Sequence, residues 1–247
     1  MTTTSHRGLA RIGVLVPYTN VNLEPDMCYL APEGVSLHFA RLGGYDIDEI
    51  PDNTQMAGLG ASDLDEPLRL ILGARPHVII YGCTSATLTH GPSFDRDLAA
   101  QIRQSSDVAT ITAAGALINA LKSLGATRVG FASPYVGTIN RQAVDFLAEE
   151  GIETVQCADI GCELGNYGQG ELRPEEVYNL GLRADSGDAQ AIVLSCTDMR
   201  SVEVIDRLEM DLGKPVICSN QALMHQALTH LSLTPAKPCG RLMRAAA

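Results

Sequence analysis

The sequence is poor in positive charge. Its 247 residues include 18 lysines and arginines against 29 aspartates and glutamates, which gives a formal net charge of −11, and the basic residues form no cluster. Nucleic acids and anionic membrane surfaces are bound by basic patches, so we expect neither as a partner. An anionic substrate would have to be held by local dipoles instead.

Two further features are missing. No apolar run approaches the ~20 residues that a membrane-spanning helix needs. The glycine-rich stretch Gly161–Gly170 follows no clear strand and fits neither GxGxxG nor GxxxxGK[ST], so a dinucleotide or ATP site is not expected. With 45% hydrophobic and 19% charged residues, the composition is that of an ordinary soluble globular protein.

The seven cysteines do not follow the pattern of a disulfide framework or a metal site. Their number is odd, the chain is long, and no signal-peptide pattern precedes the first expected strand. Cys157 and Cys162 lack a zinc-site spacing, and no second Cys/His cluster completes them. We therefore predict free thiols in a reducing cytoplasm, with no metal. Five cysteines are expected to serve packing alone: Cys28, Cys157, Cys162, Cys218 and Cys239.

Two apolar stretches end in the same way. The run from Val78 leads into Gly82-Cys83-Thr84, and the run from Ile192 leads into Ser195-Cys196-Thr197, each followed by a segment that can start a helix. Each cysteine is therefore expected at the C-terminal end of a strand. Open α/β sheets bind ligands there, and helix N-terminal amides lower the pKa of a thiol. The repeat indicates a duplicated fold that brings two thiols to one site.

Other landmarks recur at nearly the same separation. Arg11–Tyr18 (RIGVLVPY) is matched by Arg128–Tyr135 (RVGFASPY), and Thr112 is matched by Ser219. Strand-like and helix-like segments alternate about eight times, a pattern that calls for parallel sheets with right-handed crossovers. We predict an α/β fold of two similar four-stranded parallel-sheet halves, flavodoxin-like and doubly wound. The halves would be related by a pseudo-twofold axis, with the site in the cleft between them.

The first half is predicted to comprise residues 1–117 and 221–247 and to carry Cys83, and the second half residues 118–220 with Cys196. The long polar loop 43–60 is of the kind that forms a lid, a partner contact or a disordered segment. The last residues, with Pro235 and Pro238, are expected to be peripheral. A strand is predicted at 11–18, stopped by Pro17, and its repeat begins at Arg128. Further strands are predicted at 35–40, 108–112, 152–157 and 190–194 and in the stretch from Lys214 that closes the series, and helices at 63–72, 92–104, 113–124, 137–150 and 174–184.

Two thiols that face one substrate suit an enzyme without a cofactor, because one can act as a thiolate while the other donates a proton. A Cys-Thr pair at a helix start also offers backbone N–H groups and a hydroxyl, which bind a carboxylate without lysine or arginine. Asn20, Tyr135 and Asn166 are placed to join this site. Asn20 could equally be a helix cap, Tyr135 a packed aromatic and Asn166 a turn former.

These motifs resemble the aspartate/glutamate racemase superfamily, and within it the branch of maleate cis–trans isomerases and arylmalonate decarboxylases. The resemblance covers roughly residues 11–230. Arylmalonate decarboxylases carry glycine at the first cysteine position, so the presence of Cys83 favours maleate isomerases. The branch implies an enzyme without a cofactor that forms a homodimer or a larger homo-oligomer. The resemblance rests on Pro17-Tyr18-Thr19-Asn20, Gly82-Cys83-Thr84-Ser85, Ser133-Pro134-Tyr135, Asn166 and Ser195-Cys196-Thr197.

The resemblance also implies roles for these residues. The Cys83 thiolate would add to the double bond of maleate and Cys196 would protonate the neighbouring carbon, so that fumarate is released after rotation. The two carboxylates of the substrate would be oriented by Asn20, Thr84, Ser85, Tyr135, Asn166 and Thr197. A two-cysteine racemase of an amino acid or a hydantoin-like carbon acid is the main alternative. A decarboxylase and a non-catalytic binder of small acids are weaker ones.

Overall fold

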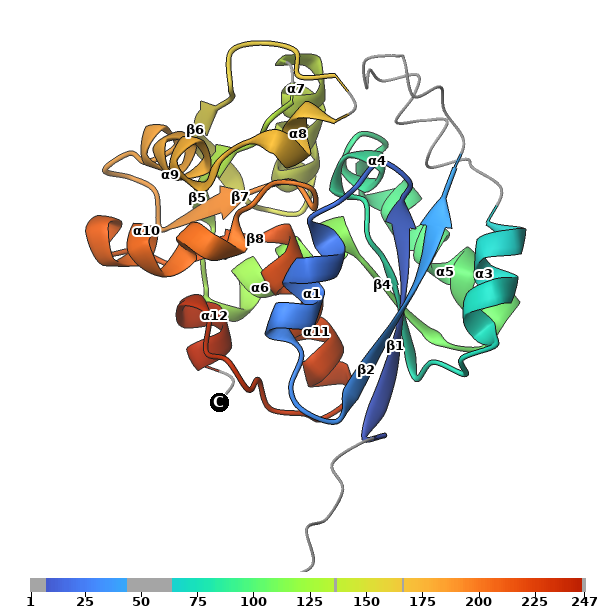
Figure 1. The fold of residues 1–247 in the computed structure, drawn as a ribbon. Helices are drawn as coiled ribbons and strands as arrows, with labels where there is room; N and C mark the ends of the chain where they lie inside the picture. The colour runs from blue at the N-terminus through green and yellow to red at the C-terminus, as the bar shows by residue number, and fades with distance from the viewer. Residues whose placement is uncertain (1–7, 44–63, 136, 166, 246–247) are drawn as a thin grey trace, which may run out of the picture.

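The computed structural model of the protein describes residues 8–43, 64–135, 137–165 and 167–245. It contains two four-stranded parallel sheets with strand orders β2-β1-β3-β4 and β6-β5-β7-β8 (Figure 1). The prediction of two similar parallel-sheet halves is confirmed, because the two orders are the same when each half is counted separately. The strands are β1 (Ala10–Pro17), β2 (Val35–Leu42), β3 (Val78–Tyr81), β4 (Ala109–Thr112), β5 (Arg128–Ala132), β6 (Glu153–Ala158), β7 (Ala191–Leu194) and β8 (Val216–Cys218).

The two strands that lead to the cysteines occupy equivalent places. In the first sheet β1 pairs with both β2 and β3, with Val14 beside Ile80. In the second sheet β5 pairs with both β6 and β7, with Phe131 beside Val193. Because β3 also pairs with β4 and β7 with β8, both strands lie in the interior of their sheets. A ligand site at their C-terminal ends is the usual arrangement in parallel sheets.

The core of the protein follows the alternation of side chains along the strands. Ile12 and Val14 of β1 belong to a core cluster that extends through both halves, whereas Leu15 belongs to a second cluster on the opposite face. Helices α6 (Ala113–Ser123) and α11 (Ser219–His230) pack on each other and contact strands of both sheets. Because the halves share this core, their strand ends are held in a fixed relative position.

The remaining helices cover the sheets from several sides. In the first half, α3 packs on β1 and β2, and α5 packs on β4. In the second half, α9 packs across β5, β6 and β7. None of the helices in the described ranges is both long and apolar enough to cross a membrane. These helices are α1 (Leu23–Leu30), α3 (Asp65–Leu72), α4 (Thr84–Leu88), α5 (Gly91–Ser106), α7 (Gly137–Glu149), α8 (Gly168–Glu171), α9 (Pro174–Arg183), α10 (Ile205–Leu212) and α12 (Gly240–Arg244), with the 3₁₀ turn η1 (Val202–Val204).

β5 ends at Ala132, before Pro134, which cannot donate to a strand ladder. One prediction about the chain needs correction. The C-terminal residues are not peripheral, because α12 packs on β8 with Leu242 and Met243 buried. Apart from Gly43, the loop predicted at 43–60 lies outside the described residues.

The C-terminal helix is also fixed by a buried charge. Glu209 of α10 is only 4% exposed, and its carboxylate accepts a hydrogen bond from the Arg244 guanidinium at 2.6 Å and from the Arg241 backbone N–H at 2.9 Å. A buried carboxylate is costly unless it is paired. The C-terminal segment therefore supplies a cation and an N–H group that pair with the buried carboxylate of α10. The proline-rich sequence of this segment did not indicate such a role.

Candidate active site

The first cysteine stands where β3 passes into the short helix α4. Gly82 precedes it and leaves no room for a side chain, since a Cβ there would lie 2.4 Å from Leu23 Cδ2. Cys83 itself is buried, and its Sγ lies 3.7 Å from Ser85 Oγ. The backbone N–H groups of Ser85 and Ala86 also donate to this sulfur. The helix start therefore directs two backbone donors at one thiol, beside a hydroxyl that can donate to the sulfur or accept from it.

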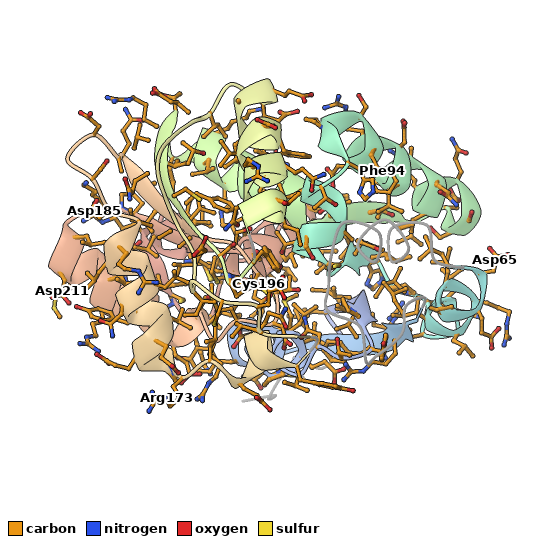
Figure 2. All side chains as sticks on the ribbon, turned by 90° about the horizontal axis from the view of Figure 1, so that it is seen from above. Asp65, Phe94, Arg173, Asp185, Cys196 and Asp211 are labelled. Atoms are coloured by element: carbon orange, nitrogen blue, oxygen red, sulfur yellow. The ribbon has the colours of Figure 1, made fainter. Side chains whose placement is uncertain are left out.

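The second cysteine follows β7. Cys196 is also buried, and its Sγ accepts a hydrogen bond of 3.4 Å from the backbone N–H of Asp198. Figure 2 shows Cys196 in the middle of the molecule, with labelled residues such as Arg173, Asp185 and Asp211 toward the periphery. Its surroundings resemble those of Cys83 in the backbone, but the residue two positions on is an acid instead of a serine.

Tyr135 connects the two thiols. Its phenol donates a hydrogen bond to Cys196 and accepts one from Ser85, whose hydroxyl lies beside Cys83. Cys83, Ser85, Tyr135 and Cys196 therefore form a continuous polar chain from one sulfur to the other. Two thiols that are far apart in the sequence, at the C-terminal ends of β3 and β7, are thus linked through Ser85 and Tyr135.

The loop after β5 fixes the position of Tyr135. The Tyr135 backbone N–H donates to Ser133 Oγ at 3.1 Å, and the Asn140 side-chain amide donates to the Tyr135 carbonyl oxygen at 3.0 Å. Ser133 Oγ and Asn140 Oδ1 are themselves hydrogen-bonded. These buried contacts tie the loop to α7, so the phenol is held in place by a network of its own half.

Burial dominates the protonation of the site. It raises the pKa of the Cys83 thiol, while hydrogen bonds from Ala86 and Ser85 act in the opposite direction. Burial, together with the negative charge of Asp198, raises the pKa of the Cys196 thiol to about 12. The pKa of Tyr135 is raised well above its ordinary value, also by burial. The expected effect of the helix-start amides is present, but burial outweighs it, so at neutral pH both sulfurs hold their protons.

Thr197 and Asn20 join the halves behind the thiols. The Thr197 hydroxyl donates to the Gly82 carbonyl oxygen at 3.0 Å and accepts from Asn20 Nδ2 at 3.1 Å. Asn20 Oδ1 accepts from the backbone N–H groups of Asn22 and Leu23 at the start of α1, at 3.1 and 2.9 Å. Asn20 thus serves the helix start, and it keeps one side-chain N–H for other partners. The Thr197 hydroxyl proton is already in use, so a ligand would meet its backbone instead.

The remaining predicted substrate-binding residues are Thr84 and Asn166. The Thr84 hydroxyl donates to Ser219 Oγ at 2.9 Å and therefore faces α11. Asn166 lies outside the described residues. Of the eight predicted site residues, the structure places seven around the junction of β3 and β7.

The sequence analysis assigned no role to Asp198, which is buried beside Cys196. Its Oδ1 accepts from the backbone N–H groups of Val21 and Asn22 at 2.8 and 3.0 Å. Gly170 of α8 lies against the carboxylate, since a Cβ there would be 2.9 Å from Asp198 Oδ2. Burial raises the pKa of Asp198 to about 6. An acid directly after the second Cys-Thr pair, where the first pair is followed by Ser85, was the signal that could have found it.

The cation beside Asn20, Arg41, is already paired. Arg41 Nη1 donates to the Asn20 carbonyl oxygen at 2.5 Å, and Arg41 Nη2 pairs with Glu24 at 2.5 Å. Arg41 therefore supports the loop that carries Asn20. In the part of the chain that the structure describes, no three His, Cys, Asp or Glu side chains are grouped to hold a metal ion. All seven cysteines carry free thiols.

Comparison with known proteins places this arrangement in a family. Residues 12–243 match the family model described as arylmalonate decarboxylase. The chain belongs to the arylmalonate decarboxylase family. The predicted resemblance to the branch of maleate isomerases and arylmalonate decarboxylases is thereby confirmed.

Two relatives with different names are similar to this chain. It is 28% identical over 256 residues to a maleate isomerase of Nocardia farcinica, covering 96% of both chains. It is 28% identical over 210 residues to an arylmalonate decarboxylase of Bordetella bronchiseptica, covering 84% of this chain and 82% of that protein.

A solved structure is also similar in fold. It is a cysteine-to-serine mutant of the Nocardia farcinica maleate cis-trans isomerase with a covalently bound succinylcysteine intermediate. It superimposes with a TM-score of 0.88 at 25% identity and covers 96% of this chain and 99% of its own. The two-half α/β architecture is thus the architecture of this relative.

Proposed function

We propose that the protein is a cofactor-independent isomerase that converts maleate, or a similar cis-diacid, to fumarate. The observation that carries the proposal is the polar chain Cys83–Ser85–Tyr135–Cys196, which connects a nucleophile to a proton donor. The relatives named maleate isomerase support it, and so does the succinylcysteine held by one of them.

In the proposed reaction the Cys83 thiolate forms a C–S bond to one alkene carbon of maleate. The π electrons move to the neighbouring carbon, which takes the proton of Cys196. The succinyl group on Cys83 then has a single carbon–carbon bond and can rotate. Cys196, now a thiolate, removes a proton from the same carbon, the double bond forms again and the C–S bond breaks. Fumarate leaves, and no proton or electron is gained or lost overall.

The reaction requires one negative charge on the thiol pair. Burial keeps both sulfurs protonated at neutral pH. The active form is therefore a minor one, in which Cys83 and Cys196 together hold a single proton. The N–H groups of Ser85 and Ala86 favour the thiolate on Cys83. The thiolate therefore forms where the backbone offers it the most donors.

Neutral donors would hold the two carboxylates of the substrate. Backbone N–H groups around Thr84, Ser85 and Thr197 would contribute, together with the side chains of Asn20, Tyr135 and Asn166. Such donors are strong inside a buried site, where an anion is not screened by water. This would allow a protein of net charge −11 to bind a dianion.

The test compares wild type with Cys83→Ser, Cys196→Ser and, as control, Cys28→Ser on the exposed face of α1. Conversion of maleate is followed by ultraviolet absorbance, and the intact protein is weighed by mass spectrometry. We expect both site variants to lose at least about 1,000-fold in turnover and the control to lose nothing. Cys196→Ser should accumulate an adduct with the mass of one maleic acid on the peptide that contains Cys83.

The proposal is wrong if the wild-type protein neither consumes maleate nor forms the adduct. The equivalent positions of the two thiols at β3 and β7 would then favour the alternative, a two-base racemase. Such an enzyme should place deuterium at the α-carbon of an amino acid recovered from D₂O. That the protein is a homodimer or larger homo-oligomer and acts in the cytoplasm stays a prediction.

A further inference from the structure

The two cysteine motifs differ at one chemically important position. The first reads Cys83-Thr84-Ser85 and the second Cys196-Thr197-Asp198. Both motifs follow equivalent strands, because β3 and β7 each pair with the first strand of their own sheet. An exact duplication would give two equivalent thiols. The residue two positions after each sulfur is therefore where the halves lose that equivalence.

Ser85 gives Cys83 a donor that can follow a change in charge. Its hydroxyl lies 3.7 Å from Cys83 Sγ and is buried with it. A hydroxyl rotates, so it can accept from a thiol and donate to a thiolate. Together with the N–H groups of Ser85 and Ala86, it lowers the pKa of Cys83 against the effect of burial.

Asp198 acts on Cys196 in the opposite way. An ionised carboxylate has no proton to donate, and its charge opposes a second negative charge on the nearby sulfur. This is the cause, after burial, of the raised pKa of Cys196. The hydrogen bonds from Val21 and Asn22 and the close approach of Gly170 hold the carboxylate where it is.

We propose that Ser85 and Asp198 assign different roles to the two thiols: Ser85 stabilises the thiolate on Cys83, and Asp198 keeps the shared proton on Cys196. The meaning of these roles for catalysis rests on the function proposed above. Both residues are positioning residues in this assignment, since each acts through the sulfur beside it.

The polar chain supplies a path for that proton. The Cys83 thiol gives its proton to Ser85 as Ser85 gives its own to Tyr135 and Tyr135 gives its own to a Cys196 thiolate. One proton leaves Cys83 and one arrives at Cys196, so the total is unchanged. The position of the proton is then decided by the groups at the two ends.

Other charged groups act on the same residues. Arg41 of β2 lowers the pKa of Asp198, although burial raises it to about 6 overall. On α1, the charge of Asp198 contributes to the raised pKa of Asp26. Tyr135 and Cys83 both act on Cys196. Asp198 is therefore ionised from neutral pH upward, the range in which its effect on Cys196 should be measured.

The experiment measures the reactivity of each thiol without any substrate. The rate of iodoacetamide alkylation is followed against pH for Cys196 in a Cys83→Ser background and for Cys83 in a Cys196→Ser background. Tandem mass spectrometry of the two peptides separates these sulfurs from the exposed Cys28, Cys157 and Cys162. The pH dependence of the rate gives the pKa of each thiol.

Asp198→Asn removes the charge and keeps an oxygen that can accept from Val21 and Asn22. We expect the pKa of Cys196 to fall by about one unit, which raises its alkylation rate at a fixed lower pH about tenfold. In the other background, Ser85→Ala should raise the pKa of Cys83 and slow its alkylation several-fold. Asp188→Asn is the matched control, because that carboxylate is 73% exposed and pairs with Arg128 on the surface.

A second variant, Asp198→Ser, gives both motifs the same three residues and should bring the two thiol pKa values closer together. The inference is overturned if Cys196 alkylates like wild type in both Asp198 variants while the proteins melt as wild type does. These readouts need no maleate, so shifted thiols in a protein that does not isomerise maleate would keep this inference and refute the proposed function. In an active enzyme, Asp198→Asn should lower kcat with little change in KM.

Discussion

The hydroxyl of Thr197 donates a hydrogen bond of 3.0 Å to the carbonyl oxygen of Gly82. The contact joins the residue after one cysteine to the residue before the other, and both partners are inside the protein. Its acceptor side is also used, by Asn20 Nδ2. The distance between the two sulfurs is thus set by a direct bond between the halves in addition to the shared apolar core.

Thr197→Val should lower the free energy of unfolding by about 1–3 kcal/mol, because the isosteric side chain leaves Gly82 O and Asn20 Nδ2 without their partner inside the protein. Urea denaturation followed by circular dichroism measures the loss. Thr138→Val, at an exposed position at the start of α7, should change stability by no more than about 0.5 kcal/mol. Equal stabilities of the two variants would contradict the role given to Thr197.

Tyr135→Phe should reduce maleate turnover by about 100-fold, because the phenol that connects the two thiols is lost. The protein should keep its fold, because the ring stays. The phenol donates to Cys196 and lowers the pKa of that thiol, so its removal should raise the pKa further. The ultraviolet assay checks the first effect and alkylation of Cys196 the second. Tyr167→Phe, at a half-exposed residue before α8, should be as active as wild type.

Gly170→Ala should impair the site, because a Cβ would lie 2.9 Å from Asp198 Oδ2 and 3.0 Å from Val21 Cγ2. Either α8 or the loop after Cys196 has to move. We expect a fall in kcat/KM of about tenfold and a loss of about 1–2 kcal/mol in stability. Gly187→Ala, where a Cβ would meet nothing within 4 Å, is the control. If Gly170→Ala behaves like this control in both assays, the close packing of α8 on Asp198 is not required.

Asp95→Asn should stabilise the protein at high pH. Burial raises the pKa of Asp95 from 3.8 to about 6, so the folded state binds this proton more tightly than the unfolded state does. The favourable effect is complete below pH 3.8 and is lost as the pH rises through about 6, where the buried carboxylate ionises. Asparagine cannot ionise.

The Asp95→Asn variant should therefore exceed wild type by about 1–3 kcal/mol at pH 8 and lose most of this advantage by pH 4. Urea titrations at several pH values give the difference, in which other titrating groups such as Asp26 and Asp198 cancel. Asp188→Asn, at the surface, should show no such trend. If the difference in the free energy of unfolding between the variant and wild type is the same at all pH values, Asp95 does not ionise in the folded protein between about pH 4 and pH 8.

Much of the fold could be predicted from local pattern. Apolar runs bounded by glycine and proline located all eight strands to within a few residues, and the matching stretches at Arg11 and Arg128 indicated two equivalent sheets. These features depend on neighbours in the sequence and on the side-chain periods of strands and helices, which a single chain displays directly. The C-terminal helix α12 was missed because its burial depends on a distant carboxylate, that of Glu209.

The sequence by itself determined that Cys83 and Cys196 each end a strand and precede a helix, since strand, turn and helix start are all encoded within about ten residues. Only the tertiary structure decided what surrounds them. Asn20 meets Thr197 across 177 positions of the chain, and Asp198 meets Val21 across the same interval. The raised pKa values of both thiols follow from burial, and that of Cys196 also reflects Tyr135 and Cys83, which are distant in the sequence, because desolvation and charge act through space and not along the chain.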